Sequence, residues 1–128
     1  FPVASELGTG VIVFSPLGTG LLTDKYLGGI PVGSRATFDQ TVGGRKLIGQ
    51  VGDQAILECL RGLNAIATKR GQTLAQMALA WVLRRPEVTS ALIGASRVEQ
   101  IEENVAALDR LDFSAEELAE IEQLVARF

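Results

Sequence analysis

The stretch Ala91-Leu92-Ile93-Gly94-Ala95-Ser96-Arg97-Val98-Glu99-Gln100-Ile101-Glu102-Glu103-Asn104 decides how this chain is organised. Its first three residues form an apolar run without polar alternation, which is typical of a strand buried on both faces. Gly94 allows a tight turn, and Ser96 with Glu99 has the Ser-x-x-Glu spacing of a capping box. The stretch therefore predicts a strand, a turn and a helix that starts after Ser96.

The two faces of the expected helix differ in chemistry. Apolar residues recur at helical spacing and are expected to pack inward, namely Val98, Ile101, Val105 and Leu108. Polar residues gather around the first two turns, namely Ser96, Arg97, Gln100, Glu103 and Asn104. The unpaired N–H groups and positive dipole end of a helix favour an anion, and Arg97 adds a full charge. By itself the stretch fits either a phosphate site or an ordinary capped helix.

Length and composition limit the fold and exclude several chemistries. The chain has 128 residues, the length of one small domain, and a net charge of −3 with no basic cluster that suggests a nucleic-acid partner. It has no histidine, which excludes a Ser-His-Asp or Cys-His hydrolase and a His-ligated metal within it. The single Cys59 indicates a reduced, cytoplasmic setting. No membrane span or signal peptide is expected, and the start at Phe1 suggests a fragment.

A second apolar run, Val11–Phe14, also predicts a strand buried on both faces. It leads into Ser15-Pro16-Leu17-Gly18-Thr19-Gly20, a turn whose glycines leave backbone N–H groups open to a ligand. From Leu27 to Val51 the chain is rich in glycine and shows little periodicity. We expect a lid, a binding loop or a disordered excursion there.

Three helices follow from their own start and stop signals. One is expected from Asp53 to Arg70, where Gly71 ends it. Capping boxes at Thr73–Gln76 and Ser114–Glu117 open the other two. Their apolar stripes are expected in the core, and they include Trp81 on the first and Leu118, Ile121 and Val125 on the second.

Strands separated by helices predict a parallel βαβ unit, in which the carboxyl ends of both strands meet at one edge. Ligands bind at this edge in parallel α/β proteins, so the two polar turns are expected to form one site. Two strands buried on both faces cannot make a sheet alone. Further strands are therefore expected from a longer polypeptide or by association.

Several segments, in their order along the chain, resemble the C-terminal portion of the aldo-keto reductase family. They are Phe14–Tyr26, Ile30–Arg35, Leu74–Leu83 and Gly94–Asn104. The resemblance covers nearly the whole chain and is greatest to the branch of bacterial glyceraldehyde-phosphate-type reductases and potassium-channel β subunits. It implies an α/β fold in which residues 1–128 are the C-terminal cofactor-binding portion of one (β/α)8 TIM barrel: strands seven and eight, their helices and the terminal helix, incomplete in this chain.

The resemblance also implies an NADPH site, with Phe14 stacked on the nicotinamide ring. The residues that it places on the cofactor are Phe14, Ser15, Pro16, Leu17, Gly18, Thr19, Gly20, Lys25, Ser34, Arg35, Gly94, Ser96, Arg97, Gln100, Glu103 and Asn104. Arg35 and Arg97 both suit a 2′-phosphate, which favours NADPH over NADH. Tyr26 is expected to be a packing residue and not the catalytic acid.

The activity that the resemblance implies is an NADPH-dependent oxidoreductase that reduces small aldehydes or ketones to alcohols. The family's catalytic tyrosine, lysine, aspartate and histidine come from earlier strands, so no catalytic residue and no metal ligand is assigned here. A regulatory subunit of the channel-β kind that binds NADPH, and a non-catalytic fragment, are the alternatives. The expected partners are a small carbonyl substrate and the remainder of the barrel, without nucleic acid or membrane, and self-association is left open.

Overall fold

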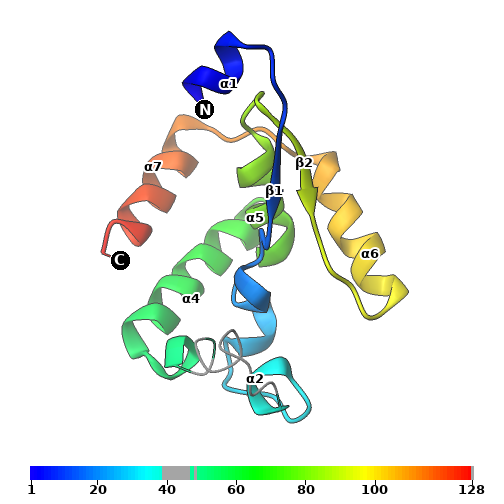
Figure 1. The fold of residues 1–128 in the computed structure, drawn as a ribbon. Helices are drawn as coiled ribbons and strands as arrows, with labels where there is room; N and C mark the ends of the chain where they lie inside the picture. Colours follow the sequence, from blue (N-terminus) through cyan, green and yellow to red (C-terminus); the bar gives the residue numbers. More distant parts are fainter. Residues whose placement is uncertain (39–46, 48, 128) are drawn as a thin grey trace.

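The computed structural model describes residues 1–38, 47 and 49–127 of the chain (Figure 1). The elements, in order, are α1 (Pro2–Glu6), β1 (Val11–Phe14), the 3-10 turns η1 (Gly18–Gly20) and η2 (Asp24–Tyr26), α2 (Arg35–Phe38), α4 (Gln54–Lys69), α5 (Leu74–Leu83), β2 (Val88–Leu92), α6 (Val98–Val105), η3 (Ala106–Asp109) and α7 (Ala115–Val125). Residues 49–52 are also helical. The chain is therefore α/β. The predicted excursion from Leu27 to Val51 lies partly outside the described residues, and its described part contains α2.

The sheet consists of β1 and β2, which pair in parallel, with Val13 opposite Ala91 and Phe14 opposite Leu92. Because α4 and α5 connect the two strands, the predicted parallel βαβ unit is confirmed. Gly10, the residue before β1, lies close against β2. A Cβ at this position would be 2.1 Å from the Thr89 hydroxyl oxygen. Both strands end at the same edge of the sheet, which brings their two turns together (Figure 1).

The strands are not buried on both faces as predicted. Ile12 and Phe14 of β1 are 63% and 80% exposed, and Leu92 of β2 is 58% exposed. The prediction is wrong for these side chains because the described residues supply only a two-stranded sheet, without a third strand or a second covering layer. The second strand also begins earlier than the apolar run, at Val88, where pairing with Val11 starts.

The main core lies between α4, α5 and α7. Its buried residues are Leu60, Leu63, Ile66, Ala67, Leu74, Met77 and Ile121. A second cluster surrounds Tyr26, which is fully buried, as expected of a packing residue. Trp81 does not belong to the core: it is 39% exposed, and the guanidinium of Arg84 stacks 3.9 Å from its ring centroid. On α7, Ile121 is in the core as predicted and Leu124 packs against it. Val125, which was also expected to face inward, is 43% exposed.

The helices of the core begin where they were predicted to begin, and two of them have the predicted capping boxes. Asp53 caps α4, and the boxes Thr73–Gln76 and Ser114–Glu117 both have their two reciprocal hydrogen bonds. Gly71 ends α4 with φ +70°, a conformation that favours glycine. The three helix starts and this stop are therefore confirmed.

The capping box at Ser96–Glu99 is wrong. Helix α6 starts at Val98, with Arg97 as its N-cap and no side-chain cap. The Gln100 side-chain oxygen instead accepts from the backbone N–H of Ser96 at 2.8 Å and from its hydroxyl at 3.2 Å. No backbone N–H of α6 donates to that hydroxyl, so Ser96 does not cap the helix. The apolar face of α6 is exposed rather than packed inward, at Val98, Ile101 and Val105 and at Leu108 beyond its end.

A buried arginine joins the end of α4 to the start of α7. Arg70 is 3% exposed, and its guanidinium donates to the side chains of Gln72 and Glu117 and to the backbone oxygen of Asp112. The Phe113 ring centroid lies 3.8 Å from the guanidinium carbon. The buried charge is thus both paired and hydrogen-bonded, which is the condition under which such burial is tolerated.

Within the described part of the chain, no helix is long and apolar enough to cross a membrane.

Candidate functional site

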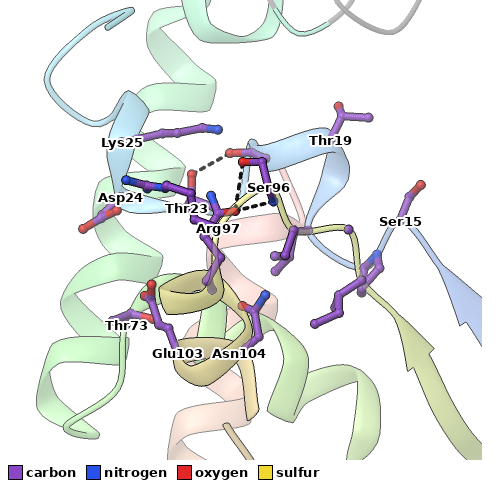
Figure 2. Close-up of a pocket in the computed structure, with 18 of the residues that line it drawn as sticks. Ser15, Thr19, Thr23, Asp24, Lys25, Thr73, Ser96, Arg97, Glu103 and Asn104 are labelled. Carbon is purple, nitrogen blue, oxygen red and sulfur yellow. Dashed lines mark hydrogen bonds between the residues drawn. The ribbon is translucent and has the colours of Figure 1, made fainter. Parts of the chain in front are cut away.

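A cavity of about 720 Å³ lies at the carboxyl ends of β1 and β2 (Figure 2). Its walls come from the turn after each strand, from the start of α5 and from α6. The lining residues are Ser15, Pro16, Leu17, Thr19, Gly20, Thr23, Asp24, Lys25, Thr73, Ala75, Leu92, Ile93, Gly94, Ala95, Ser96, Arg97, Gln100, Glu103 and Asn104. The two turns, about 80 residues apart in the sequence, thus face one hollow, as a parallel unit requires.

Most residues of the predicted cofactor site line this cavity. Phe14 and Gly18 adjoin lining residues without lining it themselves, and Ser34 lies elsewhere, with a buried hydroxyl that has no hydrogen-bond partner among the described residues. The side chain of Arg35 lies outside the described residues. The structure therefore brings together both polar turns but not the whole predicted set.

The first turn is bent by an unusual backbone. Ser15 and Thr19 both have positive φ, 52° and 58°, in the region that side chains other than glycine rarely adopt. Two hydroxyls hold the turn: Thr19 donates to the Gly18 oxygen at 2.6 Å, and Thr23 donates to the Gly20 oxygen at 2.7 Å. Strained non-glycine residues cluster at ligand sites, where surrounding structure holds them in place. Here both of them line the cavity.

Gly20 gives the turn room for a cation. A Cβ at this position would lie 3.0 Å from the Nζ atom of Lys25, which lines the same cavity. That Nζ atom is 4.9 Å from the centroid of the buried Tyr26 ring. The ammonium group is therefore held close to the backbone of the turn.

The polar groups of the cavity suit a ligand with phosphate and with hydrogen-bond donors. Lys25 and Arg97 supply two positive charges, one from each half of the wall. The lining also carries three hydroxyls: Ser96 lies beside Arg97, and Ser15 and Thr19 lie farther along the wall (Figure 2). Asp24 and Glu103 add carboxylate acceptors that suit sugar hydroxyls or an amino group. Charge-assisted hydrogen bonds from arginine are well matched to phosphate.

Several lining residues were not predicted: Thr23, Asp24, Thr73, Ala75, Leu92, Ile93 and Ala95. The topology could have indicated Thr73 and Ala75. A helix that precedes a parallel strand starts at the carboxyl edge of the sheet, and Thr73 is the N-cap of α5. Thr23 and Asp24 lie between two predicted residues, Gly20 and Lys25.

An α/β unit with a polar, cation-bearing cavity at its strand ends is the arrangement of proteins that bind phosphate-bearing ligands. Residues 1–126 match the model of the Aldo/keto reductase family. The chain belongs to this family, and the resemblance seen in its motifs is confirmed.

Named relatives fall into two groups. Two proteins called L-glyceraldehyde 3-phosphate reductase, from Escherichia coli O157:H7 and from Escherichia coli strain K12, are each 52% identical over 122 residues, which cover 93% of this chain and 34% of theirs. A putative voltage-gated potassium channel subunit beta from Schizosaccharomyces pombe is 39% identical over 128 residues, 97% of this chain and 36% of its own. The chain spans about a third of the length of these relatives.

Proposed function

We propose that the cavity binds NADPH and that the protein to which it belongs is an oxidoreductase that reduces small aldehydes or ketones to alcohols. The observation that carries this proposal is the convergence of two separate polar turns on one cavity, together with one cation from each half of its wall, Lys25 and Arg97. Membership of the Aldo/keto reductase family and the 52% identity to named reductases support it.

The residues of the cavity fit the successive parts of such a cofactor. Ser15, Thr19 and Gly20 would contact the ribose and pyrophosphate, because their tight turn presents hydroxyls and backbone at the cavity. Arg97 would pair with the 2′-phosphate, and Glu103 with Asn104 would receive the adenine. When bound, NADPH supplies the hydride for carbonyl reduction.

Phe14 would position the reactive end of the cofactor. It ends β1 next to Ser15, and its side chain is 80% exposed, so the ring face is open to stacking. A flat ring against the nicotinamide fixes its plane and keeps water from one side of it. The proton donor of the reaction would come from the remainder of the barrel.

We also propose that the βαβ unit is the seventh and eighth βα units of a (β/α)8 barrel. The side chains that neighbouring strands would cover are apolar and exposed, among them Ile12 and Leu92. The single cysteine, Cys59, is free, and burial raises the pKa of its thiol above the ordinary value, in keeping with an unreactive thiol in a reducing cytoplasm.

Cofactor titration tests the proposed function. Reduced-nicotinamide fluorescence is followed as the protein is titrated with NADPH and, separately, with NADH. Arg97→Ala should weaken NADPH binding about tenfold or more, because a hydrogen bond to a charged group contributes about 1.5–3 kcal/mol, and should leave NADH binding nearly unchanged. Arg85→Ala removes an exposed arginine before β2, outside the cavity, and should change neither affinity. Equal binding of the two cofactors by the unaltered protein would contradict the proposal.

The regulatory alternative has an observation of its own, the 39% identity to a protein named as a potassium channel β subunit. A regulatory subunit would bind NADPH with little turnover. NADPH consumption with short-chain aldehydes therefore separates the two functions: steady turnover indicates the reductase, and binding without turnover indicates the regulatory subunit.

A further inference from the structure

Helix α6 supplies three residues of the cavity wall, Gln100, Glu103 and Asn104, yet it packs loosely on the rest of the chain. None of its own residues is buried, and its apolar face is exposed. The segment that follows it is held more firmly, since Ala107 is 1% exposed and Arg110 donates to the backbone oxygen of Arg70. The position of α6 along the cavity therefore depends on polar contacts.

One side chain joins α6 to the core. The Gln76 side-chain oxygen accepts from the backbone N–H of Thr73 at 2.9 Å, and its side-chain nitrogen donates to the backbone oxygen of Glu103 at 2.9 Å. Gln76 stands on α5, whose neighbouring Leu74 and Met77 are 1% and 3% exposed. Within the described part of the chain, it is the one side chain outside residues 94–105 that hydrogen-bonds to α6.

We propose that Gln76 is a positioning residue of the nucleotide site. It sets the distance between the start of α5 and the last turn of α6, and so holds Glu103 and Asn104 at the depth of the cavity where the adenosine end binds. Gln76 itself does not line the cavity. The inference rests on the proposed function, because the ligand that it serves is the adenosine half of NADPH.

The chemistry of the amide distinguishes this role from capping. Glutamate or glutamine serves equally well as the third residue of a capping box, because the box needs only an acceptor for the N-cap N–H. The box of α7 uses a glutamate, Glu117. The bond to Glu103 needs a donor as well, and of the two residue types only glutamine supplies it at neutral pH.

The test is Gln76→Glu in the protein as its gene encodes it. This variant keeps the acceptor for Thr73, removes the donor, and places a carboxylate against the Glu103 backbone oxygen. We expect the affinity for adenosine 2′,5′-bisphosphate to fall several-fold, because the last turn of α6 loses its hydrogen bond to α5 and faces a carboxylate instead. The affinity for reduced nicotinamide mononucleotide should not change. Amides of residues 98–105 should exchange faster without ligand, and those of α4 should not.

The matched control is Ser114→Ala, which removes the side-chain acceptor of the other capping box, outside the cavity. It should lower the unfolding temperature and leave both ligand affinities and the exchange of α6 unchanged. Wild-type exchange in α6 of the Gln76→Glu protein would overturn the inference. Equal loss of affinity for both half-ligands would also overturn it, since that pattern indicates general destabilisation. If the unaltered protein binds no NADPH, the proposed function fails, while the exchange of α6 still shows whether Gln76 positions the helix.

Discussion

Two regions of the molecule both carry apolar side chains at regular spacing, but their surroundings differ. The helical body, made of α4, α5 and α7, buries its apolar stripes, as at Leu63 and Leu74. The strand edge, made of β1, β2 and α6, leaves Phe14, Leu92 and Ile101 at 80%, 58% and 49% exposure. The difference shows that periodicity determines which element forms, whereas burial requires a partner surface that the described part of the chain does not supply at the strand edge. The same strand edge carries the cavity.

The largest expected effect is the loss of stability when a buried side chain of the helical body is truncated. Leu74→Ala in the helical body should lower the free energy of unfolding by about 3–4 kcal/mol, because a fully buried leucine leaves a cavity when truncated. Leu92→Ala at the strand edge should cost less than about 1 kcal/mol in this 128-residue chain, since its side chain is already largely in water. Urea unfolding measures both values. Similar losses at the two positions would mean that the strand edge is covered.

The second prediction concerns the polar network of the helical body. Arg70→Met should cost about 2–3 kcal/mol, somewhat below the range for breaking a buried ion pair, because the Glu117 side chain keeps 21% exposure and a contact with Arg110. Lys69→Ala is the matched control, because its ion pair with Glu120 is long, at 4.0 Å, and exposed. It should change stability by less than about 0.5 kcal/mol. Thermal unfolding of the two variants gives the comparison, which fails if Lys69→Ala is the more damaging.

The third prediction compares two serines that have the same capping-box sequence. Ser114→Ala should destabilise the chain by about 1 kcal/mol, because its hydroxyl accepts from the backbone N–H of Glu117. Ser96→Ala should cost no more than about 0.5 kcal/mol, because this exposed hydroxyl only donates to Gln100 and caps no helix. Chemical unfolding separates the two costs. Equal losses of stability would indicate that Ser96 also caps its helix, which would contradict the structure.

The smallest effect is expected at the strained turn of the strand edge. Thr19→Gly should raise the free energy of unfolding by about 0.5 kcal/mol, since relief of the positive φ exceeds the added chain entropy of glycine only slightly. The same change removes a hydroxyl from the cavity and should weaken NADPH binding. Differential scanning calorimetry measures the change in stability, and a cofactor titration measures the change in NADPH affinity. A loss of stability would show that Thr19 is not strained.

The sequence predicted the elements of the helical body well, because their signals are local. Asp53, the two capping boxes and Gly71 specify helix ends through contacts within a few residues, and all of them form as expected. The parallel unit followed from two apolar runs separated by helices. Trp81 was placed wrongly because an apolar stripe broader than one helix face does not say which of its residues meets a neighbour.

The site could be predicted in its two turns and on α6, but the contribution of α5 was missed. Ser15–Gly20 and Gly94–Arg97 follow strands directly, so topology alone brings them together. The hydrogen bond from Gln76 to Glu103 depends on how α5 lies against α6, which is a tertiary contact without a local signal. The start of α6 was missed because the contact between Ser96 and Gln100 competes with capping, and sequence spacing alone does not rank the two.

The most direct measurement is amide hydrogen exchange with and without NADPH, read in residues 15–20 and 94–104. If one nucleotide cradle spans the two turns, NADPH should slow exchange in both segments, with the same dependence on NADPH concentration. Protection confined to one segment, or absent from both, would contradict a shared site at the ends of β1 and β2.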